Sequence, residues 1–546
     1  MNLRDYQTTA VERAIEAFDS VRSALWVMPT GSGKTIAFAD LTRRMESNGR
    51  AMVMAHRDEL IRQAVNKLTL VTGHEPDVEK AEYWADQNLM GLAPVVVSSV
   101  QTLNAGMNGH GRMTRFHPER FGLFVIDEAH HATSPTYRKV QDHFNQNPNL
   151  KTLGCTATPD RADEEALGQV FDEVAFVYEL IDAINDGWLV QIEQQYVQID
   201  GLDFSECRTT AGDLNGGDLD AIMRFEKNLH GVVSPMLDIV GNRKTLIFAT
   251  SVAHAERMCE IINRHKRDSA CFIQHKTPKD DRRRILDDYR DGCFQFLCNV
   301  GIATEGFDDP SIEVIIMARP TKSRCLYAQM AGRGTRPLDE IVPFINDCEQ
   351  AESRRTIISG SPKPSMLVID FAGNSGRHKL VCTADILGGR ESDEVLRRAQ
   401  KRAKEAVGPT NMTAEILTAR NELEQEAKAR RQSIVAVSSY RTREISPFDV
   451  FDMTPERERG WHRGRMPSER MKQVLRKAKI DGVEGMTLTA AGQMIEELKR
   501  RWDNKLCTYA QAKKLAEFGE DGECTFEEAS AKLDAIARNG WRALSA

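Results

Sequence analysis

A glycine-rich segment near the N-terminus constrains the fold of this chain more than any other feature. Residues 28–35 read Met-Pro-Thr-Gly-Ser-Gly-Lys-Thr, between a strand-length apolar run at 23–28 and helix-spaced apolar residues at 35–41. A strand, a glycine-rich turn and a helix in this order form a loop whose backbone N–H groups hold phosphate oxygens. The predicted phosphate-binding residues are Pro29, Thr30, Gly31, Ser32, Gly33, Lys34 and Thr35. Lys34 would contact the β- and γ-phosphates and Thr35 would ligate Mg²⁺. The sequence therefore predicts a site for a nucleoside triphosphate and Mg²⁺, although Met28 replaces the usual leading glycine and a plain glycine-rich turn is the alternative.

A second segment supplies the carboxylates that such a site needs. The apolar run 121–126 is followed by Asp127-Glu-Ala-His130. Asp127, at the C-terminal end of a predicted strand, can hold the same Mg²⁺, and Glu128 can orient the attacking water. An ordinary strand end with a helix cap is the alternative interpretation.

A Thr-Ala-Thr segment at 156–158 follows another predicted strand. The hydroxyls of Thr156 and Thr158 can link the nucleotide site to the surface that holds a substrate strand. His130 either couples to these hydroxyls or merely packs, and we expect the coupling role.

Length and composition describe a multidomain globular protein. The 546 residues are 41% hydrophobic and 28% charged, and this length suggests about three or four domains. No run approaches the ~18 apolar residues of a membrane span, and the N-terminus lacks a signal peptide, so we expect no membrane partner. Eleven cysteines without a Cys-x-x-Cys pair favour reduced thiols in the cytoplasm and argue against a zinc ribbon. Because the net charge is −7, any nucleic-acid contact must come from local basic patches.

Short apolar strands alternate with amphipathic helical stretches in two separate regions. This alternation predicts parallel sheets covered by helices on both faces, an α/β fold class. We expect a first lobe at 1–190, a polar, glycine-rich connector at 191–230 and a second lobe at 231–388.

Beyond residue 388 the strand signal stops and helical patterns follow. Residues 389–453 predict a helical arm, broken at Gly408-Pro409, and 454–546 hold a faint repeat of near forty residues that predicts two small helical modules. These modules are candidates to bind a protein partner. The segment 457–479 is rich in Lys and Arg around Trp461 and His462. Cations beside an aromatic ring suit phosphate contact and base stacking, so Arg463 and Arg465 are candidate nucleic-acid contacts, with a plain charged surface as the alternative.

Residues 329–336, Gln-Met-Ala-Gly-Arg-Gly-Thr-Arg, add two arginines from the predicted second lobe. Arg333 and Arg336 would share one helix face and point across the interlobe cleft at the γ-phosphate. An arginine so placed stabilises the transferring phosphoryl group and makes hydrolysis depend on lobe closure. Gln329 is a candidate coupling residue. Residues 304–308 precede this segment, and there Thr304 is a candidate nucleic-acid contact and Asp308 can bind ribose.

The ordered set of motifs over residues 1–385 resembles the superfamily 2 helicases and translocases of the DEAH-box type. The resemblance implies two RecA-like lobes and a DNA substrate. It implies adenine recognition by Arg4 and Gln7 in Leu3-Arg-Asp-Tyr-Gln7, and strand contacts by His56, Arg57, Ser99, Gln101, Thr250 and Ser251. Within the superfamily the chain is most similar to restriction-enzyme motor subunits, RadD-type repair helicases and phage helicases, which implies a bacterial cell or a phage-infected host. Met330 departs from the arginine common in the last motif, and the cysteine-rich zinc segment of RadD-like proteins is missing.

The motifs and the resemblance together favour an ATP-dependent DNA helicase or translocase that acts in replication, recombination or repair. Two alternatives remain open at this point. One is an ATP-gated platform that clamps nucleic acid without processive unwinding, and the other is an RNA helicase. The sequence separates them poorly because such motors grip phosphates and largely ignore base identity.

Overall fold

The computed structural model describes residues 3–56, 58–81, 83–86, 92–106, 111–157, 161–210, 212–301, 307–376, 378–389, 391–437, 446–518 and 520–540. Three predicted site residues, Arg57, Thr158 and Thr304, lie outside these ranges. The chain divides into two compact units, one of residues up to 389 with 394–420, and one of the remaining C-terminal residues. Within the described residues, no helix combines the length and the apolar character needed to cross a membrane.

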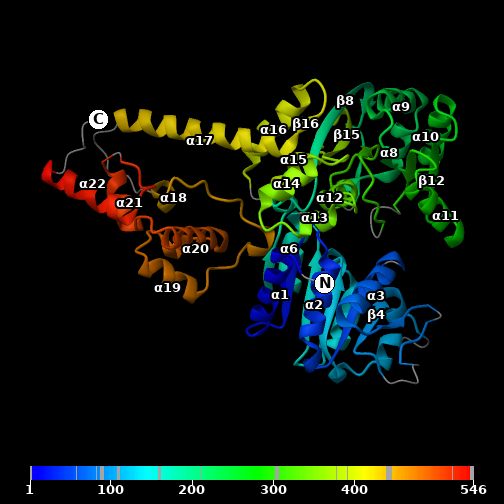
Figure 1. Cartoon of the computed structure of the whole chain (residues 1–546), viewed down its shortest axis with the longest axis horizontal. Coiled ribbons are helices and arrows are strands. Elements are labelled where there is room, and N and C mark those ends of the chain that lie inside the picture. Colours follow the sequence, from blue (N-terminus) through cyan, green and yellow to red (C-terminus); the bar gives the residue numbers. More distant parts are fainter. Residues whose placement is uncertain are drawn as a thin grey trace. The chain divides into compact units, whose positions relative to one another are not determined.

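The first lobe, blue to cyan in Figure 1, contains a seven-stranded, wholly parallel sheet. Its strand order is β3-β4-β2-β5-β6-β1-β7. Its strands are β1 (Ser23–Val27), β2 (Arg50–Ala55), β3 (Asp77–Glu79), β4 (Val95–Ser99), β5 (Phe121–Asp127), β6 (Lys151–Thr156) and β7 (Glu173–Val177). Its helices are α1 (Asp5–Phe18), α2 (Lys34–Arg44), α3 (Asp58–Thr72), α4 (Val100–Asn104), α5 (Pro135–Phe144), α6 (Arg161–Val170) and α7 (Leu180–Asn185). Every residue of the central strand β5 is buried, which explains why its sequence is an unbroken apolar run rather than an alternating one.

The second lobe carries another seven-stranded sheet, in the order β12-β13-β11-β14-β15-β8-β16. Its strands are β8 (Gln191–Asp203), β11 (Thr245–Phe248), β12 (Ala270–Ile273), β13 (Phe296–Asn299), β14 (Val314–Met317), β15 (Ser365–Asn374) and β16 (Thr410–Asn411), beside a small hairpin of β9 (Thr209–Thr210) and β10 (Asp213–Leu214). Its helices are α8 (Gly216–Met223), α9 (Glu226–Val240), α10 (Val252–His265), α11 (Lys279–Arg290), α12 (Arg324–Ala331), α13 (Val342–Asn346), α14 (Ala351–Ser359), α15 (Thr383–Leu387) and α16 (Asp393–Glu405). Among the described strands of the seven-stranded sheet, only β16 is antiparallel to its neighbour. Two parallel-sheet lobes with a helical C-terminal region confirm the predicted fold class.

The structure differs from the expected connector at 191–230. Residues 191–203 form β8, which pairs in parallel with β15 inside the second sheet, and 216–223 form α8. Buried and half-exposed positions alternate along β8, so its sequence is rich in Gln and Asp and looks like a polar loop. The second lobe therefore begins at residue 191 rather than near 231.

The boundary of the predicted helical arm also differs. The expected break at Gly408-Pro409 separates α16 from α17 (Met412–Val437), but residues 394–420 belong to the first compact unit, where β16 extends the second sheet. The first part of this region is thus an integral layer of the second lobe rather than an extension from it.

The C-terminal unit contains α18 (Pro447–Val450), α19 (Glu469–Lys477), α20 (Leu488–Asp503), α21 (Tyr509–Ala516) and α22 (Phe526–Arg538). The predicted repeat is visible in the caps, because Ser468, Thr487, Thr508 and Thr525 each accept a backbone hydrogen bond at the start of one long helix. Residues from both repeats, such as Leu475 and Leu515, pack in one hydrophobic core. The two expected modules therefore form a single small domain.

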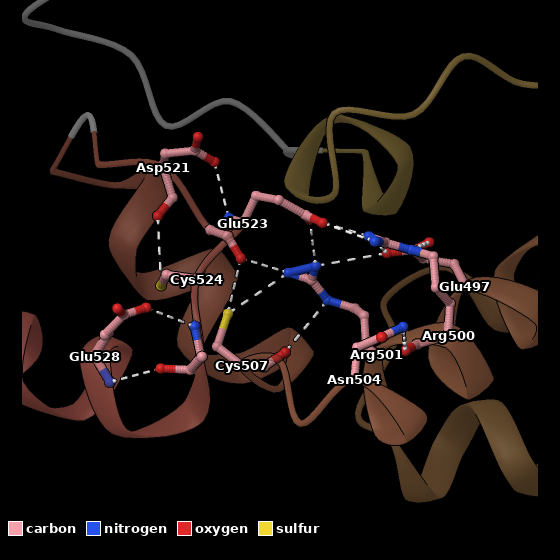
Figure 2. A network of polar contacts seen from close by, with 11 residues as sticks. Glu497, Arg500, Arg501, Asn504, Cys507, Asp521, Glu523, Cys524 and Glu528 are labelled. Carbon is pink, nitrogen blue, oxygen red and sulfur yellow. Dashed lines mark hydrogen bonds and ion pairs between the residues drawn. The ribbon is translucent and has the colours of Figure 1, made fainter.

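Arg501 joins the two halves of this domain. Its side chain is 4% exposed and interacts with Glu497 at 3.5 Å, with Glu523 at 3.0 Å and with the carbonyl of Cys507 at 3.2 Å (Figure 2). It also lies 4.4 Å from the centre of the Phe451 ring. A buried cation held on this many sides ties α20 to the loop before α22.

Candidate nucleotide-binding site

The glycine-rich loop, the candidate phosphate-binding segment, lies between β1 and α2, in the strand-loop-helix context that the sequence predicted. Gly31 and Gly33 have φ values of +85° and +75°, a region that residues with a Cβ adopt only under strain. A Cβ at Gly33 would also lie 2.6 Å from the side-chain nitrogen of Gln7. The Nζ atom of Lys34 donates to the carbonyl of Met28 at 3.2 Å, and the hydroxyl of Ser32 donates to Pro29 at 2.7 Å. The glycines are therefore required by the backbone path of the loop.

The surroundings of Met28 explain why it can replace the usual leading glycine of the motif. Its side chain is fully buried and its backbone N–H donates to the carbonyl of Thr156 at 2.9 Å, so it continues the packing of β1 beyond the strand. The loop begins one residue later, at Pro29.

The N-terminal segment braces this loop from behind. The side-chain amide of Gln7 donates to the carbonyl of Ser32 at 2.9 Å and accepts from the backbone of Arg4 at 3.0 Å. The hydroxyl of Tyr6, which sequence reasoning missed, donates to the same Ser32 carbonyl at 2.6 Å. The Tyr6 ring stacks on Tyr178 at 4.3 Å. In the sequence, only the position of Tyr6 inside the motif signalled this role.

Arg4 lies at the edge of the site. Its guanidinium is 4.3 Å from the centre of the Trp188 ring, and its Nε atom donates to Asn346 of the second lobe at 3.3 Å. Trp188 was not predicted, although an aromatic ring close to a phosphate loop is a general feature to look for when a base must be held.

Asp127 and Glu128 lie at the end of β5, beside the end of β6. Both side chains are buried, and the Glu128 backbone has a φ of +51°, which is rare for a residue with a side chain and is a strained conformation. The N–H of Glu128 donates to the carboxylate of Asp127 at 3.0 Å. Cys155 pairs with Asp127 across the strands, and burial, followed by the Asp127 charge, raises the pKa of its thiol well above the ordinary value.

His130 lies between the two segments that it was predicted to couple. Its Nδ1 atom is 3.5 Å from Glu128 Oε2 and 3.4 Å from the hydroxyl of Thr156. These contacts form because β5 and β6 are neighbours in the sheet. The sequence suggested them only through the order of the motifs.

The arginine segment of the second lobe reaches the phosphate loop. A Cβ placed on Gly332 would lie 2.9 Å from Cβ of Thr30, and one placed on Gly31 would lie 3.2 Å from Cγ of Arg336. Arg333 donates to the carbonyl of Phe307 at 2.5 Å. Arg336 forms ion pairs with Asp308 and, at 3.0 Å, with Asp339. The structure thus brings Arg336 and the predicted ribose ligand Asp308 together beside the loop.

Lys363 supports the arginine segment and was missed by sequence reasoning. Its side chain is buried, and its Nζ atom donates to the carbonyl of Arg336 at 2.8 Å and to that of Pro310 at 2.6 Å. Burial lowers the pKa of Lys363 to about 7, opposed by the charges of Asp309 and Glu313. A lone lysine before a strand carries no motif, so only the fold reveals this role. Gln329, the predicted coupling residue, is buried on α12 nearby.

The predicted strand-contacting residues of the first unit differ in their exposure and in their local role. Gln101 is exposed and its amide lies 3.3 Å from His56. Ser99 instead caps α4, and Ser251 caps α10 by accepting from His254 at 3.1 Å. Thr250 donates to Asp220 at 3.0 Å.

In the C-terminal unit, Arg463 is exposed and Arg465 is half-buried, but Trp461 is only 3% exposed. The expected base stacking by Trp461 therefore needs correction, because its ring is buried and not accessible to a base. Burial, followed by the charges of Arg465 and Arg459, lowers the pKa of the neighbouring His462 to about 4.

Comparison with known proteins gives two separate family matches, one in each lobe. Residues 1–161 match the family of the type III restriction enzyme res subunit, and residues 230–337 match the helicase conserved C-terminal domain. These are the two domains from which superfamily 2 helicases and translocases are built. Both superfamily 2 matches fall in the first unit, over the segments that carry the site.

Several relatives share this region. IRC3 of Saccharomyces cerevisiae, named as an ATP-dependent helicase, is 30% identical over 353 residues, covering 61% of this chain and 49% of the relative. The type I restriction enzyme EcoAI endonuclease subunit of Escherichia coli is 26% identical, covering 62% and 44%. The fragment of an HsdR subunit of a type I restriction enzyme from Vibrio vulnificus is 19% identical with a TM-score of 0.48, covering 68% of this chain and 64% of that one. The chain thus spans about half the length of the first of these curated relatives.

Proposed function

We propose that this protein is an ATP hydrolase that acts as a DNA helicase or translocase in replication, recombination or repair. The observation that carries the proposal is the contact of the glycine-rich loop of one lobe with Gly332 and Arg336 of the other. A nucleotide bound at this junction touches both lobes, so that binding and hydrolysis change the interaction between them. That dependence is what converts a hydrolase into a motor.

Each side chain of the site has a proposed task. Lys34 neutralises the phosphates, Glu128 orients the attacking water, and Arg333 and Arg336 stabilise charge on the transferring group. Asp308 binds ribose once Arg336 turns to the phosphates, and Arg4 and Gln7 contact adenine.

The oxygen ligands of Thr35 and Asp127 fit Mg²⁺. Asp127 is a buried carboxylate at a strand end, and a magnesium ion there would balance a charge that the interior otherwise penalises. Held by Thr35 and Asp127, Mg²⁺ would supply positive charge beside the phosphates.

We further propose that His130, Thr156, Thr158 and Gln329 pass the state of the nucleotide to the strand-holding surface. On that surface His56, Arg57 and Gln101 in the first lobe and Thr304 in the second contact phosphates. Ser99, Thr250 and Ser251 act through the helix starts that they organise, where free N–H groups favour phosphate. In the C-terminal domain Arg463 and Arg465 add salt-dependent contacts, and the domain is the candidate site for a protein partner.

Strand displacement on forked and blunt duplexes of DNA and of RNA, run with the intact chain and with Lys34→Ala, tests the proposal. We expect ATP-dependent displacement of a DNA strand, absent in the variant. Nucleic-acid-stimulated ATP turnover without displacement would favour a translocase or an ATP-gated platform, and displacement of RNA alone would favour an RNA helicase. ATP turnover that persists in Lys34→Ala would refute the assignment of the site.

A further inference from the structure

A cavity of about 200 Å³ opens in the second lobe away from the nucleotide site, and we name it the β14–β15 pocket. It lies where β14 and β15 end: Arg319 and Thr321 follow β14, and His378 and Cys382 follow β15. Tyr196 of β8 and Lys404 of α16 complete its wall. None of the motifs that define the nucleotide site contributes to it.

Positive charge dominates the lining of this pocket. Arg319, Lys379 and Lys404 line it, and the Lys404 ammonium lies 5.6 Å from the centre of the Tyr196 ring. One of these cations is partly balanced, because Lys379 lies 4.0 Å from Asp385. The lining therefore favours an anionic ligand.

A buried nitrogen of His378 indicates that the pocket takes a ligand. The side chain is 6% exposed, and its Nε2 atom has no hydrogen-bond partner among the residues that the structure describes. A buried polar atom without a partner is unfavourable by about 1–3 kcal/mol, and a bound oxygen would remove that penalty.

Asp370 is the acidic residue of the lining, and its environment weakens its repulsion of an anion. Tyr327 donates to its carboxylate at 2.8 Å, and Gln194 donates to the same oxygen. Burial raises the pKa of Asp370 to about 7, against the lowering effect of these hydrogen bonds. At neutral pH this carboxyl therefore carries much less negative charge than an ordinary aspartate.

The position of the pocket in the sheet indicates the source of the anion. The parallel strands β11, β14 and β15 are neighbours, about 4.8 Å apart, and end at the same edge. Thr250 and Ser251, the proposed strand contacts, follow β11 at that edge. A nucleic-acid strand that passes Thr250 along the edge reaches the pocket next.

We propose that the β14–β15 pocket binds a phosphate group, and that a nucleic-acid strand crossing the second lobe supplies it. The assignment of the phosphate to a nucleic-acid strand rests on the proposed function, whereas the binding of an anion by the pocket does not.

Helix α12 connects this pocket to the nucleotide site. Tyr327, near its start, lines the pocket, and the helix ends at Ala331, directly before the Gly332 that approaches Thr30. Its eight residues span about 12 Å. A phosphate held by the pocket is thus one helix away from Arg333 and Arg336, and we expect its binding to raise ATP turnover.

The test uses the full chain with Lys404→Ala and His378→Ala, and Lys401→Ala as the matched control. Lys401 lies on the same helix as Lys404 but is exposed, pairs with Glu405 and does not line the pocket. The dissociation constant of a fluorescein-labelled oligothymidylate is measured by anisotropy over a range of salt concentrations. Separately, inorganic phosphate is titrated by calorimetry. Because Lys404 is exposed, we expect Lys404→Ala to fold. This variant therefore tests the pocket even if His378→Ala does not fold.

We expect both pocket variants to raise the dissociation constant of oligothymidylate by about tenfold. In Lys404→Ala, the slope of log affinity against log salt should also fall by about one released counterion. Lys401→Ala should bind like the unmodified chain. Pocket variants that bind like Lys401→Ala would overturn the strand as the source. If inorganic phosphate still binds the unmodified chain and is lost in both variants, the anion site stands with a free anion as its ligand.

An unmodified chain that binds neither DNA nor RNA would refute the proposed function, and the phosphate titration would still decide the anion site. Phosphate binding that is equal in all four proteins, or absent from the unmodified chain, would overturn the anion site itself.

Discussion

The nucleotide site and the C-terminal domain both bury charge, but they treat it differently. Around Arg501 the guanidinium is held by two carboxylates and by backbone carbonyls. In the nucleotide site the Glu128 backbone is strained, and Lys34 rests on the carbonyl of Met28, which holds no charge to match it. A fully paired charge stabilises a fold, whereas an incompletely paired one is prepared for a ligand. The paired charges around Arg501 therefore indicate a structural role, whereas the incompletely paired charges of the nucleotide site indicate a role in binding or catalysis.

Glu128→Gln offers the largest test of this contrast. The substitution keeps the shape of the side chain but removes the carboxylate that orients water, so we expect ATP turnover to fall by about 10²–10⁴-fold while nucleotide binding persists. Steady-state turnover and equilibrium binding of a fluorescent ATP analogue measure the two effects. Exposed Glu46 in the same lobe provides the matched control as Glu46→Gln. Turnover equal to that of the control would show that the strained carboxylate has no chemical role.

Arg501→Met should produce the next largest effect, and on stability rather than on turnover. Removing the guanidinium leaves Glu497 buried with Arg500 as its remaining cation, and breaking such a pair is unfavourable by about 3–5 kcal/mol. Calorimetric unfolding of the full chain should show one transition moved to lower temperature. The exposed Arg470→Met is the control. An unshifted thermogram would mean that the domain does not depend on this cation.

Lys363→Met should give an effect of about tenfold. The variant leaves the carbonyls of Arg336 and Pro310 without their donor, which is unfavourable by about 1–3 kcal/mol and frees the arginine segment. We expect kcat to fall more than KM for ATP rises, because the proposed action of Arg336 is on the transferring phosphoryl group. Lys363→Arg should restore part of the rate, and exposed Lys276→Met should not change it. A change in KM alone would contradict a positioning role.

The pH dependence of stability provides the smallest test. The pKa of Lys363 is lowered to about 7 in the folded state from an ordinary value near 10.5, so the unfolded chain binds more protons between these values. This group therefore makes the folded state more stable as pH rises from about 7 to about 10.5. Denaturant unfolding should show that this gain is smaller in Lys363→Met than in the unmodified chain. Parallel curves for the two proteins would contradict the buried, weakly protonated lysine.

The sequence predicted those parts of the site that depend on adjacent residues. The glycine-rich loop and Asp127-Glu128 are local patterns whose backbone geometry follows from neighbouring strand and helix signals. Lys363, Tyr6 and the Arg501 network could not be predicted in this way. Each depends on segments that the fold alone brings together, such as Lys363 with Arg336.

Polar strands and buried aromatics show the same limit in the fold. The alternating polar residues of β8 fit both an edge-side strand and a loop, and its partner β15 lies far along the chain. Trp461 lies among cations in the sequence, yet its ring is buried. Composition describes what a segment contains but not which of its side chains the fold covers.

The covalent junction between the lobes has a mechanical consequence. The chain passes from α7 into β8 through Val190, whose N–H donates to the carbonyl of Thr335 at 2.8 Å, between Arg333 and Arg336. A pivot at this point would lie beside the proposed nucleotide site. A rotation of the lobes about it would displace the arginines least and the remote sheet edges most.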